Sequence, residues 1–104
     1  MSTNFPYKIG IKTLMQVHQL TGVTLEEIVS RSRVERIALA RHLAAYWMKV
    51  HHKLHPSDIG DLIQRNRTTV IYSEMYIRDQ IMIKDEYTMR MLDKLKKLNE
   101  KDKD

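Results

Sequence analysis

The chain of 104 residues contains no cysteine and is poor in residues that interrupt regular structure, with three glycines and two prolines. The absence of cysteine excludes disulfides, thiolate metal ligands and cysteine nucleophiles. The shortage of glycine and proline favours long helices over many short strands joined by turns. No apolar run is long enough to span a membrane, and the N-terminus lacks the apolar segment of a secretory signal. We therefore expect one cytoplasmic, all-α domain.

The positive charge of the chain is concentrated in its middle third. Residues 31–67 carry eight basic and three acidic side chains, and the segments on either side are neutral, so this part holds the whole net charge of +5. Such clustering is typical of a surface that meets a polyanion, although a solvated face with no ligand can have the same composition. The basic residues are Arg31, Arg33, Arg36, Arg41, Lys49, Lys53, Arg65 and Arg67.

Hydrophobic periodicity and capping residues predict a single domain of five to six helices. We expect a flexible arm over residues 1–10, the helical domain over 11–98 and a solvated tail over 99–104. Gly22 is a stop signal for the first helix, and Thr24 with Glu27 forms a capping box that starts the second. The predicted helices cover residues 11–20, 24–29, 34–52, 57–63, 67–82 and 85–98.

The longest predicted helix, over residues 34–52, has two distinct faces. One carries an apolar stripe that includes Trp47, which we interpret as a core residue rather than a platform for base stacking. The other carries Arg41 and Lys49 on either side of Ala45, whose small side chain would let a phosphate backbone approach. Pro56 is expected to end this segment.

The helices over 57–63 and 67–82 have the layout of a helix-turn-helix, because a short helix and a longer one are joined by a tight polar turn. Ser57 is predicted to cap the first helix, and Gly60 would permit close packing of the pair. Asn66 is predicted to cap the second helix, which starts with Arg67 and Thr68. In this motif the first residues of the second helix reach base edges in the major groove.

The motif Asp58-Ile-Gly-Asp, followed by Arg65-Asn-Arg-Thr-Thr-Val70, resembles the signature of the C-terminal DNA-binding domain of the bacterial replication initiator DnaA. The resemblance extends over roughly residues 12–95 and implies a helix-turn-helix of the Trp-repressor type that binds double-stranded DNA, with roles in replication or transcription. Two positions depart from the signature: Asn66 replaces an acid, and Arg67 replaces a histidine. Asparagine can pair with adenine and arginine favours guanine, so the preferred site can differ from the DnaA box.

The resemblance also implies roles for individual residues. Arg33 corresponds to a minor-groove arginine. Arg41, Lys49 and Arg65 correspond to basic positions, of which Arg65 is the signature arginine. Asn66, Arg67 and Thr68 correspond to the triplet that reads bases. The full set of predicted DNA-binding residues is Arg33, Arg41, His42, Lys49, Ser57, Arg65, Asn66, Arg67, Thr68 and Thr69.

Other kinds of site have weak support in the sequence. His51 and His55 have the spacing of metal ligands on a helix, but no further ligand completes a set, so we predict no metal and no cofactor. No constellation of nucleophile, base and acid is present, and we predict that the chain is not an enzyme. Without a glycine-rich phosphate loop we predict no nucleotide binding, and we expect a stand-alone DNA reader that lacks the ATPase module.

One group of apolar residues leaves two alternatives open. Tyr72, Met75, Tyr76 and Met82 lie off the inward stripe of the helix over 67–82. We expect the last helix to cover them. In the alternative they form a patch for a replication protein or for a second copy of the chain, which would make the domain a protein-interaction module.

Overall fold

The computed structural model describes residues 5–101, which form six helices and no strand. This confirms the all-α prediction. The helices are α1 (Phe5–Thr21), α2 (Leu25–Val29), α3 (Glu35–Val50), α4 (Pro56–Ile63), α5 (Arg67–Met82) and α6 (Glu86–Lys101). Among the described residues, no helix combines the length and apolar character that crossing a bilayer requires.

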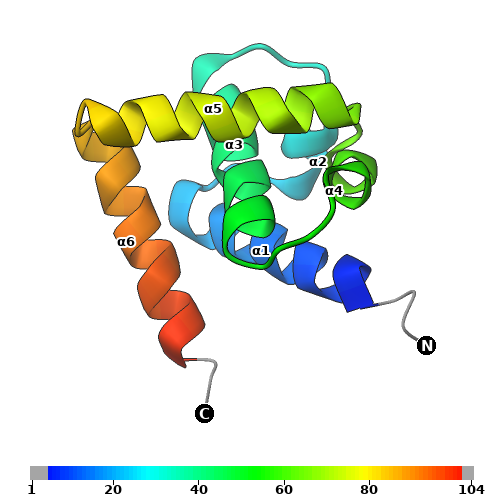
Figure 1. Cartoon of the computed structure of the whole chain (residues 1–104), viewed down its shortest axis with the longest axis horizontal. Helices are drawn as coiled ribbons and strands as arrows, with labels where there is room; N and C mark the ends of the chain where they lie inside the picture. The colour runs from blue at the N-terminus through cyan, green and yellow to red at the C-terminus, as the bar shows by residue number, and fades with distance from the viewer. Residues whose placement is uncertain (1–4, 102–104) are drawn as a thin grey trace.

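Helix α3 is the central element of the fold, and α5 lies across it (Figure 1). Its buried side chains include Leu43, Ala44, Trp47 and Met48, which confirms Trp47 as a core residue. Helices α1 and α4 pack on the same core, and α6 leaves the end of α5 and contacts α1 (Figure 1). The predicted helix-turn-helix is therefore present as α4 and α5.

The ends of the domain differ from the sequence expectation. Residues 5–10, expected in an arm, form the first turns of α1, where Gly10 lies buried against Leu62 of α4. At the other end Asn99 belongs to α6 and donates hydrogen bonds to Gln16 Oε1 (3.1 Å) and Leu95 O (2.8 Å). Residues 1–4 of the predicted arm and 102–104 of the predicted tail lie outside the described residues.

Local capping explains where the short helices begin. Thr24 and Glu27 form the predicted capping box, and Gly22 has the positive φ of 79° expected after a helix end. The predicted cap of α4 was wrong. His55 caps this helix, since its Nδ1 accepts from Ser57 N (3.0 Å), and Pro56 opens α4 instead of ending the preceding segment. Proline suits this first position because its missing N–H would have no partner there.

The expectation that the last helix covers the outer side of α5 was wrong except at Tyr76, which is half-buried. Tyr72 and Met75 are each 59% exposed, and Met82 is 80% exposed. Helix α6 diverges from α5 (Figure 1), and its buried Met91 shares a core cluster with Tyr76 and with other residues of α3 and α5.

Candidate nucleic-acid interface

The turn between α4 and α5 brings the two helices very close together. Gly60 lacks a side chain at the point of closest approach, where a Cβ atom would collide with the carbonyl oxygen of Arg65. Arg65 N donates to Gly60 O (2.8 Å), and Gln64 adopts the left-handed conformation with φ 60° and ψ 46°. The predicted role of Gly60 in close packing is thus confirmed, and the turn fixes where α5 starts.

The first turn of α5 is organised by Asn66. Its Oδ1 accepts hydrogen bonds from Thr69 N (2.9 Å) and Thr69 Oγ1 (3.2 Å), so the predicted N-cap is confirmed. Because Oδ1 is engaged in capping, only the Nδ2 donor of Asn66 remains available to an outside ligand. The side chains of Arg67 and Thr68 are exposed and make no hydrogen bond within the described part of the chain.

The loop between α2 and α3 is held in place by Arg41. This side chain is 6% exposed, and its Nε donates to Ile28 O (2.6 Å). Its Nη2 lies within hydrogen-bond distance of the carbonyls of Glu27 (3.3 Å), Ser30 (3.1 Å) and Ser32 (3.3 Å). Burial, followed by the nearby charge of Arg65, lowers the pKa of Arg41. Arg41 therefore holds the loop in place with a buried side chain, a role that the sequence did not predict, and its predicted contact with a phosphate stays a prediction.

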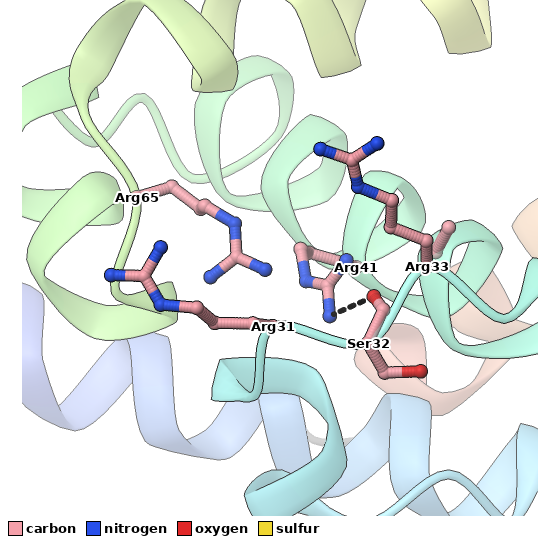
Figure 2. Close-up of a pocket in the computed structure, with 6 residues that line it drawn as sticks. Arg31, Ser32, Arg33, Arg41 and Arg65 are labelled. Atoms are coloured by element: carbon pink, nitrogen blue, oxygen red, sulfur yellow. Dashed lines mark hydrogen bonds between the residues drawn. The ribbon is translucent and has the colours of Figure 1, made fainter.

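Arg65 connects this loop to the helix-turn-helix. Its Nη2 donates to Ser30 O at 2.6 Å, so Arg65 and Arg41 share one carbonyl. The two guanidinium groups lie in a pocket of about 310 Å³, with that of Arg31 beside them and Arg33 on the same loop (Figure 2). Ser32 and Ala38 complete its lining.

The arginine pocket has an uncompensated positive charge. Within residues 5–101, no carboxylate lies within ion-pair distance of Arg31, Arg33, Arg65 or Arg67. Arginine donors arranged in a fork suit the oxygens of a phosphate, and the N-terminus of α5 adds the positive end of a helix dipole. The arrangement can therefore bind a polyanion along one continuous surface.

Three other predicted site residues lie apart from this pocket or are engaged in other contacts. Lys49 forms an ion pair with Glu74 (2.8 Å), which also binds Arg78, and these hydrogen bonds lower the pKa of Glu74. His42 is half-buried against α5, where its Nδ1 lies 2.8 Å from Ser73 Oγ. Ser57 is exposed on α4 and its backbone N binds the His55 side chain. Ala45, expected beside a phosphate, is fully buried.

Sequence reasoning missed Arg31 as a site residue. It lines the arginine pocket together with Arg33 and Arg65, although Arg31 and Arg65 are far apart in the chain. The local concentration of arginines before α3 was a usable signal, but only the folded chain shows which of them face Arg65. Ser30, whose carbonyl accepts from both Arg41 and Arg65, was likewise not identifiable.

Comparison with known proteins agrees with this geometry. The bacterial DnaA protein helix-turn-helix family matches residues 12–77, from α1 into α5. The chain is 39% identical over 56 residues to the chromosomal replication initiator protein DnaA of Picosynechococcus sp., covering 53% of this chain and 12% of that protein. It is 34% identical over 71 residues to the chromosomal replication initiator protein DnaA 1 of Chlamydia pneumoniae, covering 68% of this chain and 15% of that protein. The chain therefore spans less than a sixth of these relatives. It belongs to the DNA-binding helix-turn-helix family of bacterial DnaA proteins.

Proposed function

We propose that the chain binds double-stranded DNA with a preference for particular base sequences. The observation that carries this proposal is the group of arginines without acidic partners beside the exposed first turn of α5. Arg67 and Thr68 are free to reach base edges when α5 enters the major groove, and Asn66 contributes its Nδ2 donor. Arginine at the second helix favours guanine at the contacted position.

In this proposal the arginine pocket contacts the phosphate backbone of the DNA. Arg31 and Arg65 would bind backbone phosphates, and Arg33, which is exposed on the same loop, would enter the adjacent minor groove. Thr69 donates both its hydroxyl hydrogen and its backbone N–H to Asn66 Oδ1, so its role in this proposal is to hold Asn66 in position. Lys49 is not assigned a phosphate contact, since its ammonium group forms an ion pair with Glu74.

We further propose a replication-related role near the bacterial nucleoid, because both relatives described above are chromosomal replication initiators. The matched part of those proteins is short, so this role rests on the DNA-binding domain alone. The DnaA box is the first sequence to test, with the departures at Asn66 and Arg67 favouring an altered base preference at the positions that they contact.

The test is fluorescence anisotropy of a labelled duplex with a DnaA box and of a scrambled duplex, across a salt series. We expect Arg67→Ala to cost about 1–3 kcal/mol on the preferred duplex and to relax base preference. Arg31→Ala should weaken both duplexes alike and flatten the salt dependence. Arg90→Ala on α6 removes the same charge outside the arginine pocket and serves as the control. If all three variants bind DNA as the parent does, the proposed interface is wrong.

A second candidate function is binding of another protein, such as a replication protein, through the outer side of α5. The specific observation is the exposure of Tyr72 and Met75, which no described element covers. If this is the function, we expect weak DNA binding without a base preference. We also expect Tyr72→Ser to abolish binding of the partner protein and to leave the affinity for duplex DNA unchanged. Sequence-selective DNA binding that survives Tyr72→Ser would favour the first function.

A further inference from the structure

The two ends of the Asn66 side-chain amide lie in different surroundings. Its Oδ1 faces Thr69, which donates both its backbone N–H (2.9 Å) and its hydroxyl hydrogen (3.2 Å) to this one oxygen. An amide oxygen has two lone pairs, so these two bonds use up the capacity of Asn66 to accept. Because a backbone N–H can only donate, the oxygen must point toward Thr69, and Nδ2 points away from it.

The Nδ2 group of Asn66 is therefore the end of the amide that an outside ligand can meet. Asn66 is exposed, and its Nδ2 makes no hydrogen bond within residues 5–101. An amide nitrogen carries two N–H donors and no acceptor. The neighbouring side chain of Arg67 is also exposed and likewise contains donors only. At the start of α5, these two adjacent side chains thus offer donors to a base edge.

A second helix cap in the same fold shows how an acid would differ from Asn66. Asp85, which immediately precedes α6, accepts hydrogen bonds from Thr88 N (3.0 Å) and Thr88 Oγ1 (2.8 Å), the same two donors three residues further on. A single oxygen, Oδ2, accepts both bonds, so a carboxylate in this arrangement keeps its other oxygen as an acceptor. The two caps have the same pattern of hydrogen bonds, but asparagine leaves a donor where aspartate leaves an acceptor.

We propose that Thr69 is a positioning residue that sets base specificity, because it holds Asn66 as a pure donor and directs it to guanine or thymine instead of adenine. This inference rests on the proposed binding of double-stranded DNA. In the major groove, guanine presents the acceptors N7 and O6, and thymine presents O4. Asparagine pairs with adenine by donating to N7 and accepting from the N6 amino group, and Oδ1 is not available for the second bond. Cytosine presents only an amino donor, so it is the least favoured base.

The test begins by finding the base pair that Asn66 contacts. Anisotropy titrations of duplexes varied at each position of the preferred site give this base pair as the one at which Asn66→Ala loses the base preference of the parent chain. There we expect the parent chain to bind guanine or thymine at least about fivefold more tightly than cytosine. Replacing adenine at this position by purine, which lacks the 6-amino group, should not weaken binding by the parent chain.

Variants of Thr69 then test its role directly. Thr69→Val removes the hydroxyl but keeps the shape of the side chain and the backbone N–H, so it frees one lone pair of Asn66 Oδ1. We expect this variant to bind the adenine duplex about fivefold more tightly than the purine duplex, the effect of one regained hydrogen bond. Thr69→Ser keeps the hydroxyl and should behave like the parent chain. Thr88→Val is the matched control, because it removes the same bond from the cap of α6 and should leave base preference unchanged.

The outcomes separate this inference from the proposed function. A parent chain without base preference would overturn the proposed function and this inference with it. Selective binding that favours adenine or cytosine at the position of Asn66, or a site in which Asn66→Ala changes no preference, would overturn this inference alone. The same holds if purine weakens binding by the parent chain, or if Thr69→Val and Thr88→Val have the same ratio of adenine to purine affinity.

Discussion

At the scale of single residues, two positions set the geometry of the turn that leads into α5. Gly60 allows the backbone of Arg65 to pack directly against α4, and its carbonyl oxygen accepts the hydrogen bond from Arg65 N. Gln64 occupies a left-handed conformation in which a side chain is strained. The tight turn brings Arg65 close enough to reach Ser30 O.

Replacing Gly60 by alanine should therefore damage the fold at this turn. The added methyl group meets a backbone carbonyl that cannot move without opening the turn, so we expect Gly60→Ala to lower the free energy of unfolding by about 1–3 kcal/mol. Urea denaturation measures this loss. Gly10→Ala is the matched control, because its methyl group meets the end of the Leu62 side chain, which can change rotamer. An equal loss in the two variants would contradict the explanation.

At the scale of elements, the loop between α2 and α3 depends on one buried side chain. Arg41 binds the carbonyls of four loop or helix-end residues, and no described carboxylate forms an ion pair with it. The loop in turn carries Arg31 and Arg33 of the proposed interface. Arg36, on the same helix, pairs with Glu27 at the surface (3.1 Å) and has no such role.

We expect Arg41→Ala to lower the free energy of unfolding by about 2–4 kcal/mol, because it leaves several buried carbonyls without donors. It should also weaken DNA binding indirectly, since the loop loses its position. Arg36→Ala removes the same charge and should change stability by no more than about 0.5 kcal/mol. Thermal unfolding and the anisotropy titration measure the two effects. A stable Arg41→Ala protein with reduced DNA affinity would instead indicate that Arg41 contacts phosphate directly.

The start of α5 offers a second prediction at this scale. Asn66→Ala removes the cap and should cost about 1 kcal/mol of stability, whereas Asn66→Asp keeps an oxygen that accepts from Thr69 N. Aspartate lacks the Nδ2 donor, so Asn66→Asp should retain stability and change base preference if Asn66 reads DNA. Chemical denaturation and binding to duplexes varied at one base pair distinguish the two roles. Equal stability of the alanine and aspartate variants would contradict the capping role.

At the scale of the whole molecule, three histidines make stability depend on pH. Burial is the main cause that lowers the pKa values of His42, His51 and His52 from 6.5. Their neutral forms are thus favoured in the folded chain, and the stability they contribute is complete above pH 6.5. This contribution to stability is lost as the pH falls from about 6.5 through the pKa values that the three histidines have in the folded chain, which are lower than 6.5.

Urea denaturation between pH 7.5 and 5.5 should therefore show a falling free energy of unfolding, in a range above the pKa values of Glu27 and Glu74, which are lowered from 4.5. The variant His42→Asn can retain a hydrogen bond to Ser73 but has one titrating group fewer. Its free energy of unfolding should therefore fall less steeply with decreasing pH than that of the parent chain. A free energy that is constant or rises toward pH 5.5 would contradict this interpretation.

The sequence alone determined the features that depend on neighbours within one turn of helix. The caps at Thr24 and Asn66, the stop at Gly22 and the bounds of α5 follow from short-range hydrogen bonds and φ preferences, and all were predicted. The helix-turn-helix followed as well, since its two helices are adjacent in the chain. The cap of α4 was missed because Ser57 and His55 can both fill that role locally.

Only the tertiary structure decided which charges face solvent. Arg41 and Arg36 look alike in sequence, yet one lies buried under a loop while the other is exposed. Lys49 forms an ion pair with Glu74, and Arg31 lies in one pocket with Arg65, through contacts between segments that are distant in the chain. The exposure of Tyr72 likewise depends on the direction in which α6 leaves α5. Periodicity predicts which residues share a face of one helix, but it cannot predict what that face meets.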